Sequence, residues 1–264
     1  MEKEDYTHLI KKFKEISEKG FIKGVNNLNN GVGLTFEEQL GKKADSEFFP
    51  DYKGIEIKCS QRFSRYSISL FTLAFDGPSV YEMNRLLEKY GKFDYQYVNA
   101  KTLIVNLKIN NYVLFNDKYY FKLYVDYEKE RLSLAVYDLE YNLLDEASYI
   151  DFSSLKSRLE VKLSKMALIY ASKKVINDAN HFRYYKINIY QLKSFERFIK
   201  LIEEDIVKIT LLGRISRCGE REGRTRNKNM LFQISKLKLD ELFYNIYSYN
   251  TDENKNSSNF MIFR

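Results

Sequence analysis

Apolar and polar residues alternate along this chain with two different periods. A spacing of three to four residues predicts helices, which cover residues 9–16, 32–40, 79–90, 153–163, 192–202 and 237–247. A spacing of two, or a short apolar run, predicts strands, which cover residues 54–59, 67–75, 102–109, 119–127, 131–138, 167–175, 206–212 and 231–234. Because the two kinds of element alternate, we expect an α/β (α+β) fold with one continuous core or two close lobes.

Local signals mark the ends of some of these elements. Gly41 follows the second helix and is expected to cap its C-terminus. Ser79 and Glu82 have the spacing of a capping box at the start of the third helix. The long polar tract over residues 250–259 predicts a tail or loop.

Composition narrows the class of protein. A chain of 264 residues is long enough for one large domain or two lobes. Cys59 and Cys218 are too few for a disulfide-rich scaffold or a four-cysteine zinc site, and they fit a reducing cytoplasm. Because His8 and His181 are the only histidines, we expect any metal site to use carboxylates, which suit a hard cation such as Mg²⁺. The polar start and the lack of a long apolar stretch predict no signal peptide and no membrane span.

The charge balance is basic. The chain has 43 Lys and Arg against 36 Asp and Glu, which gives a net charge of +7 and points weakly to a polyanionic partner. Lysine supplies most of the excess, and codon bias in an AT-rich genome would produce the same enrichment. The arginines are more informative, because five of them fall between Arg214 and Arg226.

The candidate chemistry is concentrated in residues 50–58. Side chains alternate along a strand, so Glu56 and Lys58 point to one face while the isoleucines beside them point into the core. Asp51 comes just before the strand, after a turn that we assign to Pro50. The sequence can thus bring two carboxylates and one ammonium group together at a sheet edge.

Such a trio suits phosphodiester hydrolysis. Asp51, Glu56 and the backbone carbonyl of Ile57 would hold Mg²⁺, or Mn²⁺ in its place, through oxygen ligands. The ion would activate a water molecule, and Lys58 would orient that water or stabilise charge on the phosphate. The alternative is a surface strand with solvated Glu and Lys side chains, because Asp-x4-Glu-x-Lys is short enough to occur by chance.

A second segment lies a short loop upstream. Asn30–Gly41 reads Asn-Gly-Val-Gly-Leu-Thr-Phe-Glu-Glu-Gln-Leu-Gly. Together with residues 50–58 it resembles the MvaI/BcnI restriction endonucleases, relatives of the mismatch-repair nicking enzyme MutH in the PD-(D/E)xK nuclease superfamily. The family pattern is Gly-Val-Gly-x-Thr-Leu-Glu-x-x-Leu-Gly, then Pro-Asp, then Ile-Glu-Leu-Lys, so Phe36 and Ile57 each replace a leucine.

The resemblance implies a restriction-endonuclease-like fold, with a mixed central sheet flanked by helices and two lobes around a DNA cleft. It implies that residues 1–160 form a catalytic lobe and residues 161–264 a recognition lobe, although one interlocked domain is an alternative. It also implies that Glu37 joins the catalytic set of Asp51, Glu56 and Lys58.

Glu38 competes with Glu37 for this role, because it could instead close a capping box with Thr35. Neighbouring residues on a helix point about 100° apart, so only one of the two can face the metal. The family pattern selects Glu37.

The resemblance is fainter elsewhere. Residues 67–78 are similar to the family's strand after the catalytic lysine, residues 165–234 follow the family's order loosely, and residues 95–150 do not align. The family often has Gly-x-x-His-Asp-His-Gly where residues 223–229 read Gly-Arg-Thr-Arg-Asn-Lys-Asn. Since that region reads bases in the family, we expect the recognised DNA sequence to differ more than the cleavage chemistry.

Basic side chains supply the candidate DNA contacts. Three glycines between residues 213 and 223 predict a flexible loop. Because arginine binds guanine and phosphate with two hydrogen bonds, we expect this loop to recognise DNA. Its cations are Arg214, Arg217, Arg221, Arg224, Arg226 and Lys228. Arg62 and Arg65 follow the catalytic strand and could contact the backbone near the scissile phosphate. For both segments the alternative is a solvated charged loop.

The leading hypothesis is a Mg²⁺-dependent, sequence-specific endonuclease of a bacterial type II restriction system. It would act in the cytoplasm as a monomer on double-stranded DNA, with a companion DNA methyltransferase for the same site. One alternative is a nicking endonuclease, either a repair enzyme or one subunit of a two-chain enzyme. The other is a DNA-binding module without catalytic activity, against which the intact carboxylate–lysine set argues.

Overall fold

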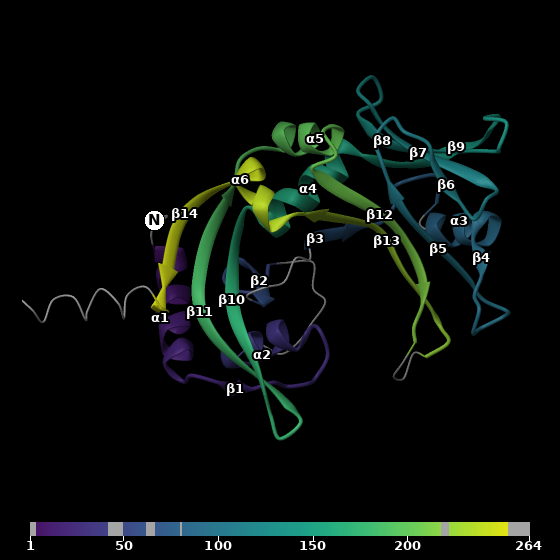
Figure 1. Ribbon diagram of the computed structural model, residues 1–264. Helices are drawn as coiled ribbons and strands as arrows, with labels where there is room; N and C mark the ends of the chain where they lie inside the picture. Colours follow the sequence, from purple (N-terminus) through teal and green to yellow (C-terminus); the bar gives the residue numbers. More distant parts are fainter. Residues whose placement is uncertain (1–3, 42–49, 62–66, 80, 218–221, 253–264) are drawn as a thin grey trace, which may run out of the picture. The chain divides into compact units, whose positions relative to one another are not determined.

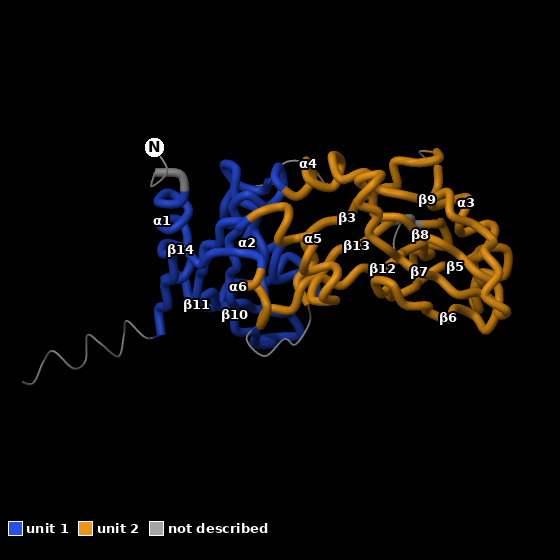
Figure 2. Tube along the Cα trace, turned by 90° about the horizontal axis from the view of Figure 1, so that it is seen from above, with its two compact units in different colours: residues 1–66, 160–193, 242–264 blue, residues 67–159, 194–241 orange. Residues whose placement is uncertain are grey.

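The computed structural model describes residues 4–41, 50–61, 67–79, 81–217 and 222–252. Six α-helices and fourteen strands form in these ranges (Figure 1), which confirms the mixed α+β class. The chain divides into two compact units (Figure 2): unit 1 is residues 1–66, 160–193 and 242–264, and unit 2 is residues 67–159 and 194–241. No helix within the described ranges is long and apolar enough to cross a membrane.

Unit 1 is built on a mixed five-stranded sheet. Its strands are β1 (Ile22–Lys23), β2 (Glu56–Gln61), β10 (Lys165–Ile176), β11 (Ala179–Leu192) and β14 (Phe243–Asn250). The order is β1-β11-β10-β2, and β14 also pairs with β11. β2 runs parallel to β10, whereas the other pairs are antiparallel.

One face of this sheet is covered by α1 (Glu4–Glu18) and α2 (Gly31–Gln39). Fully buried side chains from both helices meet the inner face of β2, β10 and β11 in one cluster, which includes Leu9, Phe13, Phe36, Ile55, Ala167, Ile169, Tyr184 and Ile187. The helical spacing predicted from the sequence therefore produces the apolar stripe that covers this face. The polar residues between the apolar ones of β2 point to the opposite face.

Unit 2 contains two antiparallel sheets. One has the order β3-β13-β12-β5-β4 and the other is a meander, β6-β7-β8-β9. The strands are β3 (Ile68–Leu73), β4 (Lys92–Phe93), β5 (Lys101–Leu107), β6 (Val113–Phe115), β7 (Tyr119–Asp126), β8 (Arg131–Tyr137), β9 (Leu143–Asp151), β12 (Val207–Ile215) and β13 (Thr225–Ile234). The helices are α3 (Glu82–Tyr90), α4 (Phe152–Leu163), α5 (Phe195–Glu203), the 3-10 turn η1 (Lys236–Lys238) and α6 (Leu239–Leu242); α4 continues into unit 1 at residue 160.

The two units differ from the expected division into residues 1–160 and 161–264. β10 follows residue 160 but pairs with β2 from the first part of the chain, and β12 and β13 pair with β5 and β3. Each unit is therefore discontinuous in sequence. Hydrogen bonding between distant strands decides this membership, and the order of elements along the chain does not reveal it.

Residues 237–247 do not form the predicted helix. A short helical stretch ends at Leu242, and the chain continues as β14 beside β11. Tyr247 contacts Tyr6, and Tyr249 contacts Phe13, both on α1. Pairing with β11 and packing against α1 thus override the local helical spacing of this segment.

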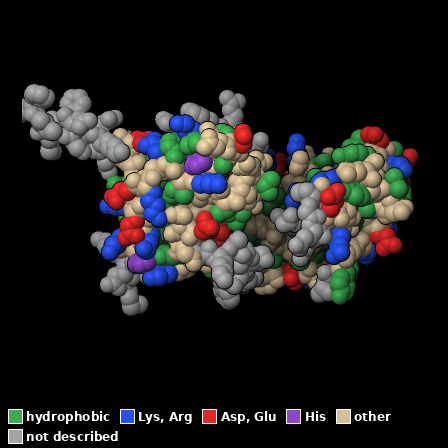
Figure 3. All heavy atoms as spheres, turned by 90° about the horizontal axis from the view of Figure 1, so that it is seen from below, with side chains coloured by type: hydrophobic (Ala, Val, Ile, Leu, Met, Phe, Trp, Pro, Cys, Tyr) green, Lys and Arg blue, Asp and Glu red, His purple; other side chains and the backbone are tan. Residues whose placement is uncertain are grey.

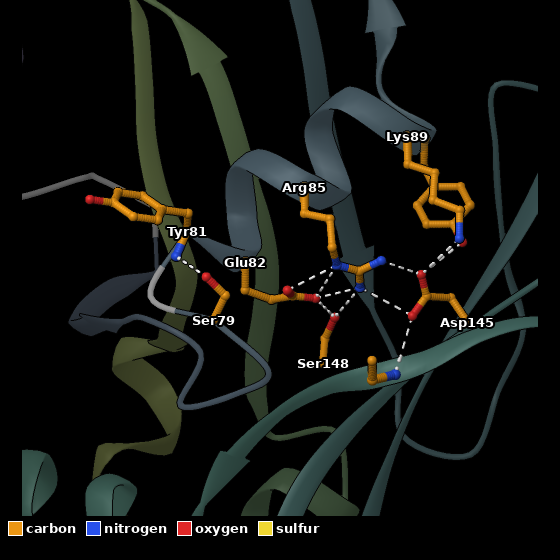
Figure 4. Close-up of polar contacts among 9 residues, drawn as sticks. Ser79, Tyr81, Glu82, Arg85, Lys89, Asp145 and Ser148 are labelled. Carbon is orange, nitrogen blue, oxygen red and sulfur yellow. Dashed lines mark hydrogen bonds and ion pairs between the residues drawn. The ribbon is translucent and has the colours of Figure 1, made fainter.

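The predicted capping box of α3 is also wrong. The Ser79 hydroxyl accepts a hydrogen bond from the backbone amide of Tyr81 at 3.1 Å, and Tyr81 itself precedes the helix without capping it. Glu82 turns inward and is only 1% exposed. Its carboxylate accepts hydrogen bonds from Arg85 and from the hydroxyl of Ser148, as Figure 4 shows.

Arg85 joins α3 to β9 through two acidic side chains. Its Nε lies 2.9 Å from Glu82 Oε2, and its Nη1 lies 2.6 Å from Asp145 Oδ2. Burial by itself raises the pKa of Asp145, but hydrogen bonds from Arg85, a backbone amide, Tyr90 and Lys89 outweigh burial and lower that pKa well below 3.8. The network replaces the helix cap as the device that holds this end of α3.

We expect Arg85→Met to lower the free energy of unfolding by about 3 kcal/mol, because it leaves the buried Glu82 and Asp145 without their shared guanidinium. Urea denaturation followed by circular dichroism measures this loss. Lys129→Met is the matched control, since the Lys129 side chain is 67% exposed and its Nζ lies 3.5 Å from Asp126 Oδ2. We expect this variant to lower the free energy of unfolding by less than about 1 kcal/mol. Equal losses in the two variants would contradict a buried role for Arg85.

The contribution of Asp145 to stability depends on pH. Because folding lowers its pKa, the stabilisation is complete at neutral pH and decreases as the pH falls below the ordinary value of 3.8. We therefore expect the difference between wild type and Arg85→Met to shrink in acid. A difference that grows below pH 3.8 in the same denaturation experiment would show that the sign is wrong.

Candidate active site

A tight turn precedes β2 in unit 1. The backbone amide of Tyr52 donates to the carbonyl of Ile55 at 3.0 Å, and the amide of Ile55 donates to the carbonyl of Tyr52 at 2.8 Å. Lys53 and Gly54, which lie between them, have φ values of 45° and 79°. Two central residues with positive φ are typical of a type I′ turn, which favours glycine at the second position.

The turn folds Asp51 back against the strand that follows. Asp51 Oδ2 accepts a hydrogen bond from the backbone amide of Ile57 at 2.9 Å. The reversal is thus made by the Lys-Gly pair, not by Pro50 as the sequence suggested. This turn accounts for the four residues between Asp51 and Glu56, because two of them form its centre and two form its closing pair.

Glu56 and Lys58 lie on the same face of β2, as the alternation predicts. Lys58 Nζ is 2.6 Å from Glu56 Oε1, and the two side chains are 23% and 3% exposed. Ile55 and Ile57 point to the other face and belong to the unit 1 core. Burial raises the pKa of Glu56, and the positive charge of Lys58 opposes this shift while the negative charge of Asp51 adds to it.

Gly31 and Thr35 of α2 each have a structural role. A Cβ atom on Gly31 would lie 2.7 Å from the backbone oxygen of Asn26, so a side chain at this position would collide with the preceding loop. Thr35 Oγ1 donates to the Gly31 carbonyl at 2.7 Å and accepts the amide of Val25 at 3.1 Å. Because the threonine bonds within the helix and to the loop, it does not form a capping box with Glu38.

The middle of α2 is held by β11. The hydroxyl of Tyr184 donates to the carbonyl of Val32 at 2.8 Å, and the ring of Tyr184 meets Phe36 with centroids 5.0 Å apart. These contacts fix the rotation of the helix about its axis. Glu37 is consequently half-buried, whereas Glu38 is exposed.

The negative charge of Glu37 acts on the thiol of Cys59, a residue of β2. Desolvation raises the pKa of the Cys59 thiol most, and the negative charges of Glu37 and Asp51 raise it further. Both carboxylates therefore lie close enough to β2 to act on the same side chain. A thiol with a raised pKa is a poor nucleophile.

The donor set fits a hard divalent cation. Across the described ranges, no group of three or more His, Cys, Asp or Glu side chains is arranged to hold an ion. Asp51 and Glu56 form a pair, and the backbone of Ile57 adds a carbonyl on the same edge, because the amide and carbonyl of one strand residue point the same way. Two carboxylates and a carbonyl leave room for water and substrate oxygens, as Mg²⁺ requires.

Lys162 is a site residue that the sequence did not reveal. It lies in the last turn of α4, and its Nζ is 2.8 Å from Glu56 Oε2. Its side chain is 11% exposed. No short motif connects residues 56 and 162, and the sequence showed only a lysine near the end of a predicted helix.

The arginine-rich segment of unit 2 is a two-stranded arm in its described part, rather than the expected flexible loop (Figure 1). β12 and β13 pair through Arg214 and Arg226, and the ladder continues where the amide of Ser216 donates to the carbonyl of Arg224 at 3.0 Å. The side chain of Arg214 is half-buried and that of Arg224 is exposed. Antiparallel pairing orders the base of this segment without DNA.

Arg217 is already paired with a carboxylate. Its guanidinium donates to both oxygens of Asp94, at 2.8 and 2.5 Å, and lies over the rings of Tyr95 and Tyr97. The hydrogen bonds from Arg217, together with the amides of Gln96 and Tyr97, lower the pKa of Asp94 despite its desolvation. This contact braces the arm against residues 94–97.

Several predicted DNA contacts lie outside the described residues, namely Arg62, Arg65 and Arg221. Only the backbone of Arg226 and Lys228 is described. On the face drawn in Figure 3, basic and acidic side chains are interspersed over the described surface and do not separate into one broad basic patch. The net charge of +7 therefore does not by itself mark a binding surface there.

The comparisons with known proteins cover the segments that form this site. The model of the MvaI/BcnI restriction endonuclease family matches residues 10–243, which include α2, the turn before β2 and β2 itself. No curated protein sequence matches the chain.

The solved structures similar to the chain include two of MvaI. The structure of restriction endonuclease MvaI in complex with its cognate DNA is 26% identical, with a TM-score of 0.83 over 94% of this chain and 98% of that one. MvaI in the absence of DNA is 24% identical, with a TM-score of 0.55 over 91% of this chain and 96% of that one, and supports the fold alone. Since the family match spans most of the sequence and the resemblance seen in its motifs is confirmed, the chain belongs to the MvaI/BcnI restriction endonuclease family.

Proposed function

We propose that this protein is a Mg²⁺-dependent, sequence-specific endonuclease that cleaves double-stranded DNA within a short site, as the nuclease of a type II restriction system. The observation that carries the proposal is the pairing of Asp51 and Glu56 beside Lys58 on one edge of β2. The MvaI structure with cognate DNA supports DNA as the substrate class.

Each residue of the site has a distinct task in this proposal. Asp51, Glu56 and the carbonyl of Ile57 hold the divalent ion, and Mn²⁺ substitutes for Mg²⁺. When bound, the ion supplies Lewis acidity and a water molecule of lowered pKa. Lys58 donates a hydrogen bond to the attacking water or to a phosphate oxygen, and Glu37 adds a third carboxylate that orients the water.

The basic side chains bind the duplex. On the arginine arm, Arg224 is exposed and Arg214 is half-buried. The pairing of Arg214 with Arg226 and the hydrogen bond from Ser216 to Arg224 hold their backbone in place. With Arg62, Arg65, Arg221, Arg226 and Lys228 they contact phosphates and base edges. Arg217 acts indirectly, because it is bound to Asp94 and holds the arm.

In its biological setting we propose a monomer in the bacterial cytoplasm, with a companion DNA methyltransferase that modifies the same site. A monomer with one such site cuts one strand and then reorients for the other. The alternative is a nicking endonuclease, and plasmid cleavage separates the two: open circles that never become linear favour the nickase.

We expect supercoiled plasmid to be cleaved in Mg²⁺ and to remain intact in EDTA. Lys58→Ala and Glu37→Gln should each slow cleavage at least about 100-fold, because charge stabilisation and water orientation are lost. Glu38→Gln is the matched control and should cleave at the wild-type rate, since Glu38 is exposed on the same helix. Wild-type rates for Lys58→Ala, or no cleavage by the wild type on any DNA, would refute the proposed activity.

The two arginines of the arm should behave differently. We expect Arg224→Gln to weaken DNA binding and to reduce the slope of log affinity against log salt concentration by about one, the effect of one lost phosphate contact. Its thermal midpoint should not change. Arg217→Gln should lower the thermal midpoint, because the Asp94 carboxylate loses its cation. Fluorescence anisotropy and thermal denaturation test both, and an unchanged salt slope for Arg224→Gln speaks against DNA contact by the arm.

A further inference from the structure

Two ammonium groups from different elements hold the Glu56 carboxylate. Lys58 Nζ is 2.6 Å from Oε1, and Lys162 Nζ is 2.8 Å from Oε2. The carboxylate is 3% exposed. Each oxygen of this central acidic group is therefore engaged by its own cation.

The chain connection fixes the position of Lys162. α4 ends at the fully buried Leu163, and β10 begins two residues later. Met166 of β10 is the register partner of Glu56 in the parallel pair with β2. Lys162 thus lies four residues before Met166, which sits beside Glu56. Its approach to Oε2 therefore follows from the strand pairing rather than from a flexible surface side chain.

The charges around Glu56 nearly cancel. Glu37, Asp51 and Glu56 contribute three negative charges, and Lys58 and Lys162 contribute two positive ones. A divalent cation that takes an oxygen of Glu56 competes with the ammonium group already bound to that oxygen and is repelled by its charge. Lys58 belongs to the catalytic motif on the same strand, so Lys162 is the group that can withdraw without removing the catalytic lysine.

We propose that Lys162 is a positioning residue that competes with the divalent cation for Oε2 of Glu56. It neutralises and orients the buried carboxylate while the site contains no ion, and it is displaced when the ion binds. This inference rests on the proposed function, because it assumes that Asp51 and Glu56 are metal ligands. It predicts that the enzyme binds metal more weakly than its carboxylates alone would allow.

The test measures Mn²⁺ binding without DNA and without turnover. Free Mn²⁺ is quantified by electron paramagnetic resonance while wild type, Lys162→Met and Lys162→Arg are titrated. We expect Lys162→Met to bind Mn²⁺ roughly tenfold more tightly, because a positive charge next to the ion is removed. Lys162→Arg is the matched control, since it keeps the charge, and should bind as the wild type does.

Unchanged or weaker Mn²⁺ binding by Lys162→Met would overturn the inference, because a purely structural ion pair does not oppose the metal. Circular dichroism checks that each variant folds, and Lys162→Gln serves as a second neutral variant. If neither neutral variant folds, Lys162 is a structural requirement of unit 1 and the inference is wrong.

Asp51→Asn separates this result from the proposed function. If the wild type binds Mn²⁺ and Asp51→Asn binds it less, Asp51 is a ligand, and the Lys162 variants decide the competition. If neither the wild type nor any Lys162 variant binds Mn²⁺, the metal site itself is wrong. A lower Mg²⁺ concentration for half-maximal plasmid cleavage by Lys162→Met is the expected functional counterpart.

Discussion

The parallel pairing of β2 with β10 joins parts of the chain that are more than a hundred residues apart, and most of unit 1 depends on it. On one face of the pair, Ile57 and Ala167 lie side by side and complete the core beneath α1 and α2. On the other face, the same register sets Glu56 beside Met166 and brings the end of α4 over the carboxylate. One ladder of backbone hydrogen bonds thus supports both the core and the chemistry.

The site contains a buried carboxylate that two lysines neutralise. Burying Glu56 without partners would be costly, and the two lysines compensate for the lost hydration. Asp51 is held differently, by the amide of Ile57, which orients it without adding a positive charge. The result is a pair of carboxylates held in place in the folded chain, one by two lysines and one by a backbone amide.

Positive charge in unit 2 is likewise divided between support and binding. Arg85 and Arg217 are held by acidic partners and stabilise α3 and the arginine arm, whereas Arg224 is exposed. A count of basic residues would treat the three alike. Their partners in the structure distinguish those that hold the protein together from those that are available to a polyanion.

Much of the site was evident from the sequence, because its parts are local. The alternation of Glu56 and Lys58, the core role of Ile57 and the helix that carries Glu37 all follow from spacing within a few residues. The type I′ turn that sets Asp51 was assigned to the wrong residue, since Lys53 gives no signal of its positive φ. The capping box at Ser79 failed because a buried partner, Arg85, bound Glu82 more strongly than the helix end could. Lys162, the discontinuous units and the β14 strand were decided only in the tertiary structure, because each depends on pairing between segments that are distant along the chain and that local periodicity does not encode.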